Sequence, residues 1–305
     1  MRHPVLILTG RYGRLANRLF LTAHALAAAE ELGGSVLNLV FEEYADYFVG
    51  TEQDMLCRYP QQQSLIRHPK LRNQYCKVLR WIVDLHSKRN SSLGRVKHLV
   101  LPDLREFYSL EGEEFKELAS STGYIVLNGW RFRAHSLLEK HRERVKEYFS
   151  LSERYQTSVE NLHKEIRERS DIVVGVHIRQ GDYRYHFGGR HFYEDSQYIS
   201  LMQHINELFP QKKVLFLVCS NEQKSEEAFP DLKVRVAKGN EVEDLYSLAA
   251  CDYIVGAPST YSMWASYWGG PPLYIIEDSN CRPELSHFTV NSYPRELEER
   301  FFFSS

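Results

Sequence analysis

The stretch Asp171–Tyr183 joins a buried-strand pattern to three side chains that suit phosphate chemistry. Its first half is a nearly continuous apolar, β-branched run, which predicts a strand buried inside a parallel sheet. The run ends at Arg179, so we expect His177, Arg179 and Asp182 at the carboxyl end of that strand, where open α/β sheets bind ligands. A guanidinium there suits a phosphate group, because its planar fork donates two charge-assisted hydrogen bonds at once. The alternative is that the three side chains only pair with one another.

A second candidate site is Gly256-Ala-Pro-Ser-Thr260, between a predicted strand and a predicted helix. Ser259 or Thr260 suits the cap of that helix, and the free amides of its first turn attract anions. A capped helix without a ligand is the alternative. The aromatic residues that follow at helical spacing favour the core over a sugar platform; they are Tyr261, Trp264, Tyr267 and Trp268.

Asp244 stands near the start of a third predicted element, the acidic helix that begins at Glu241. Acidic residues in a first turn favour the helix dipole, and capping is the simpler interpretation. Asp244 is also placed so that one carboxylate accepts both the ring N–H and the exocyclic amine of guanine. Other common nucleobases lack that donor pair, so we expect a guanine-binding role for Asp244.

The amino-terminal loop Gly10–Arg18 contains Gly13 and three arginines, Arg11, Arg14 and Arg18, ahead of an Ala- and Leu-rich helix. Glycines and cations at a helix start make an anion site. The loop has neither the dinucleotide-binding G-x-G-x-x-G spacing nor the lysine of a P-loop. An ordinary strand–helix turn with solvated arginines is therefore the alternative.

The second half alternates strands and helices, which predicts a doubly wound parallel sheet. A short helix beginning at Glu222, capped by Ser220 or Asn221, is also expected. The predicted strands are 171–178, 213–219, 234–237, 253–256 and 273–276, and the predicted longer helices are 193–208, 241–250 and 261–268.

The first half opens with a strand over 5–9, a helix to about Leu32 and a strand over 36–40. Helical spacing of Leu71, Tyr75, Val78, Leu79, Ile82 and Leu85 predicts another helix. Strands are expected over 98–101 and 124–127, and helices over 134–149 and 152–168. We place a domain boundary after this pair of helices, giving an amino-terminal α/β domain over 1–168 and a nucleotide-sugar-binding domain over 169–305.

Composition describes an ordinary globular protein: 305 residues, 43% hydrophobic and 26% charged. A net charge of −2 provides no overall field for nucleic acid. The five cysteines form no C-x-x-C pair, which disfavours both a disulfide framework and a zinc ribbon. The longest apolar runs are too short for a signal peptide or a membrane span, so we expect a cytosolic protein, at most peripheral to a membrane.

These segments together resemble the fucosyltransferase superfamily of α-1,2-, α-1,6- and protein O-fucosyltransferases, and the α-1,2 branch above all. Gly13-Arg-Leu-Ala-Asn-Arg-Leu-Phe20 is similar to that branch's G-G-L-G-N-Q-L-F segment, and His177-Ile-Arg-Gln-Gly-Asp-Tyr183 to its H-x-R-R-G-D-Y motif. The stretch from Asp244 to Trp264 resembles its D-L-x-x-M-x-x-C and N-S-T-F-S-W-W block. The match covers the amino terminus and nearly all of the second half.

The resemblance implies a GT-B-like fold of two Rossmann-type domains, a GDP-sugar donor with GDP-fucose foremost, a glycan hydroxyl as acceptor, inversion at the anomeric carbon and no metal cofactor. The implied donor-binding residues are Gly13, Asn17, His177, Arg179, Asp244, Ser259 and Thr260. The sequence itself contains no Asp-x-Asp pair for a metal-bound diphosphate, so the positive charge must come from Arg179 and helix amides.

The expected chemistry is attack by an acceptor hydroxyl while the departing GDP gathers charge on its β-phosphate. Arg179 and Asp182 are the expected catalytic residues, with Arg179 on that phosphate. The candidates for a general base are Asp182, His186, His191 and Glu194. Gln180, Arg18 and Pro258 depart from the family motifs. These departures leave a different GDP-sugar open.

Two other functions remain open on the sequence. One is a non-catalytic protein of the same fold that binds GDP or another nucleotide. The other is a sulfotransferase, because arginine-rich loops also hold the phosphates of its adenine donor.

Overall fold

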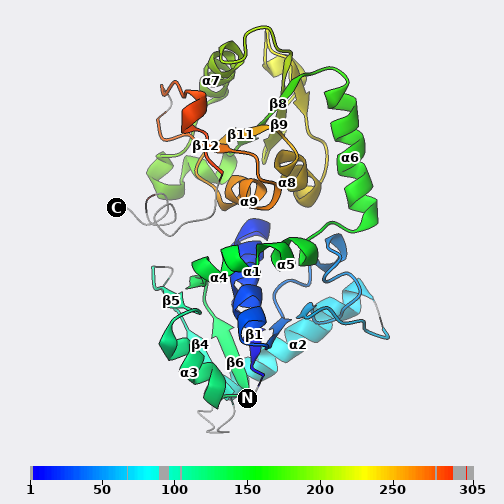
Figure 1. Ribbon diagram of the computed structural model, residues 1–305, viewed down its shortest axis with the longest axis vertical. Coiled ribbons are helices and arrows are strands. Elements are labelled where there is room, and N and C mark those ends of the chain that lie inside the picture. Colours follow the sequence, from blue (N-terminus) through cyan, green and yellow to red (C-terminus); the bar gives the residue numbers. More distant parts are fainter. Residues whose placement is uncertain are drawn as a thin grey trace. The chain divides into compact units, whose positions relative to one another are not determined.

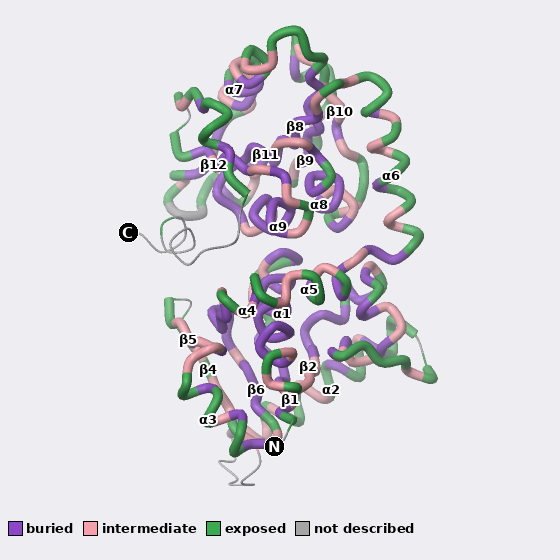
Figure 2. Tube along the Cα trace, in the orientation of Figure 1, coloured by how far each residue is buried: buried purple, intermediate pink, exposed green. Residues whose placement is uncertain are grey.

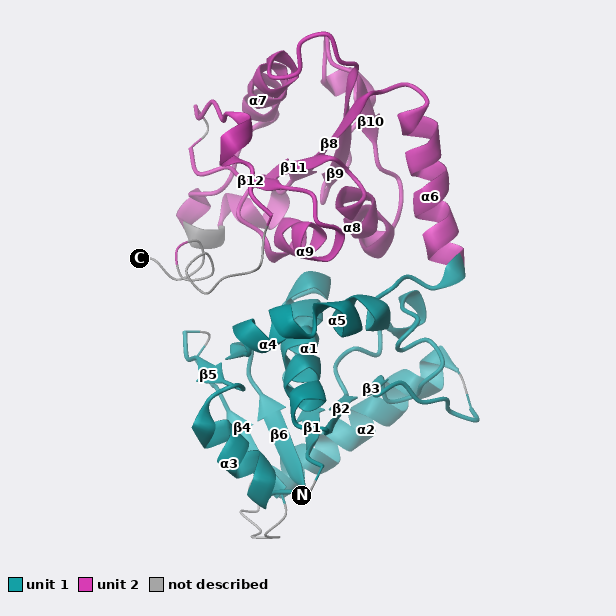
Figure 3. Cartoon of the chain, viewed as in Figure 1, with its two compact units in different colours: residues 1–153 teal, residues 154–305 magenta. Residues whose placement is uncertain are grey.

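The computed structural model describes residues 3–66, 68–88, 96–103, 105–278, 280–290 and 300, apart from the side chains of 88, 186 and 187. The chain divides into two compact units, residues 1–153 and 154–305 (Figure 3). Each unit contains its own five-stranded sheet.

The sheet of the first unit has the strand order β3-β2-β1-β6-β4. Strands β1 (Val5–Leu8), β2 (Ser35–Asn38), β6 (Tyr124–Asn128) and β4 (Val96–Val100) run parallel, and the short β3 (Arg58–Tyr59) runs antiparallel to β2. Helix α1 (Leu15–Glu31) follows β1 and is buried along most of its length (Figure 2). Its Ala- and Leu-rich sequence suits a helix enclosed by other elements.

Several of the remaining elements of the first unit were not predicted from the sequence (Figure 1). Two-residue strands β5 (Tyr108–Ser109) and β7 (Phe132–Arg133) pair with each other. One predicted helix, over 134–149, is instead two, because the chain leaves helical geometry at His141. The helices are α2 (Pro69–Lys88), α3 (Glu113–Ser121), α4 (His135–Lys140) and α5 (Arg142–Tyr148), and Ala45–Tyr47 forms a 3₁₀ turn.

The sheet of the second unit is entirely parallel, with the strand order β10-β9-β8-β11-β12. Its strands are β8 (Ile172–Ile178), β9 (Val214–Ser220), β10 (Val234–Val236), β11 (Tyr253–Gly256) and β12 (Leu273–Ile275). The first strand of the unit, β8, lies between β9 and β11, so the chain reverses its winding direction there. Ligands of such sheets bind at this switch point, beyond the carboxyl ends of the strands. The predicted doubly wound sheet is confirmed.

Helices α6 (Glu153–Arg167), α7 (Asp195–Glu207), α8 (Glu241–Ala249) and α9 (Thr260–Gly269) complete the second unit, with 3₁₀ turns at Gly181–Arg184, His186–Gly189, Glu226–Ala228 and Leu285–His287. The expected helix from Glu222 is wrong. The Asn221 side chain accepts from the Gln180 amide at 2.9 Å and donates to the Gln180 carbonyl at 3.3 Å, so it does not cap a helix. Trp264 and Tyr267 are fully buried, as expected for core aromatics.

The observed division falls before the body of α6, whereas the sequence placed a boundary at 168/169. The α6 side chains explain the difference. His163 Nε2 lies 2.8 Å from the Ser247 carbonyl oxygen, and Arg167 donates to both carboxylate oxygens of Asp252, at 2.5 and 3.0 Å. These contacts attach α6 to α8 and to the turn before β11.

Within the described part of the chain, none of the helices is both long and apolar enough to cross a bilayer. All five cysteines are free, and four of them are buried.

Candidate functional site

His177 is the last side chain but one on β8, at the carboxyl edge of the sheet. Its neighbours on the adjacent strands are Cys219 of β9 and Gly256 of β11. A Cβ at position 256 would lie 2.9 Å from the His177 carbonyl oxygen, so this approach requires glycine. Burial, with a smaller contribution from Arg179, lowers the pKa of His177 to about 3. The imidazole is therefore neutral at physiological pH, and its buried Nδ1 has no hydrogen-bond partner among the described residues.

Arg179 follows at the end of β8, with 18% of its side chain exposed. Its Nη2 donates to Asp182 Oδ2 at 2.8 Å, and its guanidinium lies 5.4 Å from the Tyr183 ring centroid. Its Nε is buried, and no acceptor for it exists in the described part of the chain. The pairing of Arg179 with Asp182 is thus real, but it uses only part of the guanidinium, which has five N–H donors.

Tyr261, in the first turn of α9, lies at the centre of these groups. Its ring centroid is 4.7 Å from that of His177, and its hydroxyl donates to the Glu241 carbonyl at 2.7 Å. Burial raises the pKa of Tyr261, and the charges acting on it include Asp244 and Arg179. The Tyr261 ring therefore lies where the end of β8, the start of α8 and the start of α9 meet.

The start of α9 has a capped helix N-terminus, a feature that suits anion binding. Ser259 is the cap, and its Oγ accepts from the Tyr261 amide at 3.2 Å. Thr260 is the first helical residue of α9. The Tyr183 hydroxyl donates to the Pro258 carbonyl at 2.6 Å, which attaches the loop after β8 to this helix start.

Asp244 lines a cavity of about 340 Å³, a size typical of small ligand pockets. Its Oδ1 accepts from the Gly239 amide at 3.1 Å. A Cβ on residue 239 would come within 2.8 Å of that same oxygen, so glycine is needed there. Burial raises the pKa of Asp244 to about 6, against a smaller lowering by the Gly239 amide. The carboxylate is therefore ionised at neutral pH. Because it is only partly solvated, hydrogen bonds from two further donors would stabilise it.

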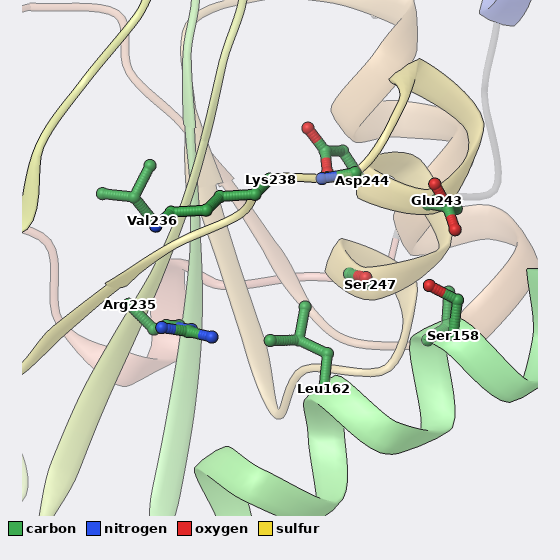
Figure 4. A pocket seen from close by; sticks show the side chains of 10 residues that line it. Ser158, Leu162, Arg235, Val236, Lys238, Glu243, Asp244 and Ser247 are labelled. Carbon is green, nitrogen blue, oxygen red and sulfur yellow. The ribbon is translucent and has the colours of Figure 1, made fainter.

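Most of the pocket wall was not expected from the sequence. Figure 4 shows Ser158 and Leu162 reaching in from α6, opposite Asp244 and Ser247 of α8. Arg235 and Lys238, on β10 and the loop after it, supply positive charge, although Arg235 also pairs with Glu165 and Glu226 at 3.2 and 3.5 Å. No sequence motif marks these residues; only the packing of α6 against α8 brings them together.

Gln180, which stands where the family motif has its second arginine, is buried in a polar cluster. Its Nε2 donates to the Tyr193 carbonyl and to Asp195 Oδ1, both at 2.9 Å. Lys224 donates to Gln180 Oε1 at 2.7 Å and to the two Asp195 oxygens at 2.7 and 2.8 Å. We call Gln180, Asp195 and Lys224 the loop clamp, because they join the two ends of the segment 181–193, which carries Asp182.

The four candidates for a general base differ in their surroundings. Asp182 is paired with Arg179 and is about half exposed. His191 is buried, and Glu194 precedes α7 in a capping box with Gln197. The side chain of His186 lies outside the described part of the chain. Asp182 is therefore the candidate that contacts Arg179, the residue expected to bind the phosphate.

The amino-terminal candidates Gly13 and Asn17 lie in the first unit, after β1. Gly13 has a φ of +62°, and a Cβ there would meet the side-chain nitrogen Nδ2 of Asn17 at 2.0 Å. Arg18 is buried, donates to the carbonyls of Gly13 at 3.1 Å and Val40 at 3.3 Å, and pairs with Glu43. Arg11 pairs with the same carboxylate. Two of the three arginines therefore stabilise the loop itself.

Metal-ligating side chains do not gather within the described ranges: no group of three or more His, Cys, Asp or Glu is placed to hold an ion.

Comparisons with known proteins bear on both the sequence and the fold. A family model described as Glycosyl transferase family 11 matches residues 98–284. A search of curated proteins found no match. Among solved structures, a mutant of Arabidopsis thaliana FUT1 in complex with GDP matches with a TM-score of 0.56 and 13% identity, over 92% of this chain and 71% of that one. The α-1,6-fucosyltransferase NodZ from Bradyrhizobium, in a crystal soaked with GDP-fucose, matches with a TM-score of 0.53 and 15% identity, over 93% and 97%.

These results confirm two expectations. The family model agrees with the fucosyltransferase superfamily that the motifs indicated, and the solved structures share the GT-B-like fold of two α/β units.

Proposed function

This chain belongs to glycosyl transferase family 11, and from that premise we propose that it transfers L-fucose from GDP-fucose to a hydroxyl group of a glycan. We propose further that the reaction inverts the anomeric carbon and needs no metal. The solved structures with a similar fold support the choice of donor, since one is in complex with GDP and another was soaked with GDP-fucose.

The observation that carries the proposal is the Asp244 carboxylate on the wall of the cavity. Guanine presents a ring N–H and an amine side by side, and a single carboxylate accepts both. Asp244 Oδ1 is oriented by the Gly239 amide and keeps a lone pair for a ligand, while Oδ2 has no partner within the described ranges. A partly buried carboxylate that accepts only one hydrogen bond from the described residues is suited to this base.

The diphosphate is proposed to bind at the switch point of the sheet. Arg179 offers its remaining N–H groups, and neutral His177 offers a ring nitrogen. The amides that begin α9 add a partial positive charge at the helix end. Gly13 and Asn17 are proposed as further donor contacts, and the first unit as the acceptor side.

In the proposed mechanism an acceptor hydroxyl attacks the anomeric carbon as the bond to the β-phosphate breaks through an oxocarbenium-like transition state. The carbon–oxygen bond to the acceptor forms on the opposite face, and GDP leaves with the bonding electron pair. Arg179 and the start of α9 stabilise the charge that develops on the phosphate. Asp182, next to Arg179, is the proposed acceptor of the hydroxyl proton.

The nucleotide assignment is tested by Asp244→Asn. The amide oxygen still accepts the ring N–H of guanine, but the amide NH₂ faces the guanine amine instead of accepting from it. We expect GDP affinity to fall about 10–100-fold, because a bidentate base contact contributes about 1–3 kcal/mol. Xanthosine diphosphate, with a carbonyl in place of the amine, should bind the variant better than GDP. Glu243→Gln, on the same pocket wall, should keep the preference for GDP. Unchanged GDP affinity in Asp244→Asn would refute the assignment.

Turnover is tested with a panel of GDP-sugars, reading the release of GDP with and without a chelator. GDP-fucose should be the best donor, and the chelator should leave the rate unchanged. Tight binding of GDP by calorimetry without release from any GDP-sugar, across a panel of glycan acceptors, would instead indicate a non-catalytic nucleotide-binding protein.

A further inference from the structure

Helix α2 (cyan in Figure 1) has one face that packs on the first unit and one that does not. On the inner face, Cys76, Leu79 and Val83 pack against a cluster that contains Ile7 and Val126 of the sheet. Two arginines fix the same side of the helix: Arg72 donates to Asp46 and Arg80 to Glu42, at 2.6 and 2.9 Å. One face of α2 is therefore packed against the first unit and fixed by ion pairs.

The outer face of α2 is largely apolar from Leu71 to Ile82, about 17 Å of the helix, with the exposed Gln74 among the apolar side chains. Five of its large apolar side chains are between 47% and 62% exposed; they are Leu71, Tyr75, Val78, Trp81 and Ile82. They recur at intervals of three and four residues, which places them on one side of the helix. The preceding loop adds Leu65, which is fully exposed, and Ile66. Continuous apolar surface of this kind marks an interaction site in a soluble domain.

The charges along this face show what kind of partner it fits. Lys70 and Lys77 are both exposed and stand seven residues apart, so they lie along one border of the apolar stripe. Asp84, seven residues beyond Lys77, continues the same border as the one acidic residue of the helix, so the border carries two positive charges near its start and one negative charge further along. Trp81 and Tyr75 are the residue types that prefer the boundary between lipid and water. An apolar stripe with aromatic residues and a lysine border is the pattern of helices that lie in the surface of an anionic bilayer.

We propose that the outer face of α2, consisting of Leu65, Ile66, Leu71, Tyr75, Val78, Trp81 and Ile82 with Lys70 and Lys77, docks the protein on an anionic lipid surface. The apolar side chains enter the boundary between headgroups and acyl chains, and the two ammonium groups stay at the level of the lipid phosphates. This inference concerns the first unit alone and does not depend on the donor specificity proposed above. Its test measures binding to vesicles, not turnover.

The test is flotation of the full chain with vesicles of phosphatidylcholine alone or with about one third phosphatidylglycerol. We expect recovery with the anionic vesicles only, and a loss of binding as salt rises and screens the lysines. Lipid should also shift the Trp81 emission to shorter wavelength, and Trp81→Phe should remove that shift. Equal recovery with both vesicles, or with neither, would overturn the proposal.

Two pairs of variants sharpen the test. Val78→Glu with Ile82→Glu should abolish recovery, whereas Val100→Glu, equally exposed on β4, should not. Lys70→Glu with Lys77→Glu should weaken binding about tenfold or more, since each lysine near an anionic surface contributes severalfold, whereas Lys97→Glu should have little effect. All these positions are exposed, so the fold should persist.

A dimer that dissociates in Val78→Glu with Ile82→Glu, without vesicle binding by the parent chain, would assign the face to a second copy instead.

Discussion

Both units carry an arginine-containing turn after the first parallel strand of their sheet, but the arginines are used differently. In the first unit, both Nη nitrogens of the buried Arg18 have acceptors: two backbone carbonyls and Glu43, which also pairs with Arg11. Only its Nε lacks one within the described part of the chain. In the second unit, Arg179 uses only Nη2, which donates to one half-exposed carboxylate, so its Nη1 as well as its Nε have no acceptor within the described ranges. The number of arginines in a turn therefore does not identify an anion site; the number of donors that remain available does.

The contrast is tested most strongly by removing one arginine from each turn. Arg179→Ala should lower kcat about 10²–10³-fold, the usual cost of losing a preorganised contact to developing charge. Arg11→Ala removes an exposed ion pair, which contributes at most about 1 kcal/mol to stability, and should leave kcat unchanged. Steady-state rates of GDP release and thermal melting of both variants provide the measurement. If Arg11→Ala reduces turnover as much as Arg179→Ala, the distinction between the turns fails.

Partly buried cations of the two units offer a second, smaller contrast. Lys224 belongs to the loop clamp, whereas Arg80 pairs with Glu42 in the first unit at 2.9 Å. Each change to Met should lower the free energy of unfolding, by about 1–3 kcal/mol for Lys224 because its partner Asp195 is partly solvated. Only Lys224→Met should also lower kcat, up to about 10²-fold, because it releases the segment that carries Asp182.

Comparing kcat with KM separates positioning from mere destabilisation in the Lys224 variants. Loss of positioning should appear in kcat at temperatures where the variant is fully folded, and Lys224→Arg should restore part of it. A folded Lys224→Met enzyme with normal kcat would show that the clamp only stabilises the fold.

The pH dependence of GDP binding should report on Asp244. Burial raises the pKa of this carboxyl to about 6, so the folded chain holds its proton more tightly than the unfolded chain does. Stability from this group therefore falls as pH rises from about 4 to about 6 and is constant above that. Guanine needs the ionised form, so GDP affinity should drop about tenfold from pH 7 to pH 5. The GDP phosphate also titrates near pH 6. Subtracting the pH profile of GDP affinity measured for Asp244→Asn leaves the contribution of the Asp244 carboxyl. Identical profiles for the two proteins would show that Asp244 does not bind the guanine.

The sequence predicted the sheet of the second unit because each of its strands is a short apolar run with a turn signal after it. It predicted the candidates His177, Arg179, Asp244 and Ser259 because strand ends and helix starts can be located from local patterns alone. The role of α6 could not be predicted, since a polar-faced helix gives no sign of which sheet it packs against. The side chain of Asn221 likewise meets Gln180, 41 residues away, and so leaves the expected helix uncapped. The spacing of apolar residues in α2 predicted a helix but not that one apolar face would remain exposed.

The smallest expected effect concerns two glycines, one in each unit, that both precede a helix. At Gly239, a Cβ would stand 2.8 Å from Asp244 Oδ1 and from Glu243 Cβ, whereas at Gly112 the nearest atom would be 3.6 Å away. Gly239→Ala should therefore push the Asp244 carboxylate out of place and weaken GDP binding, by about tenfold if one hydrogen bond to guanine is lost. Gly112→Ala should leave GDP affinity unchanged, since the nearest atom lies at an ordinary contact distance, and should cost at most about 1 kcal/mol of stability, because Gly112 caps α3. Calorimetric titration of both variants with GDP measures the difference. Normal affinity in Gly239→Ala would mean that the carboxylate tolerates displacement, and that guanine is not read by its fixed position.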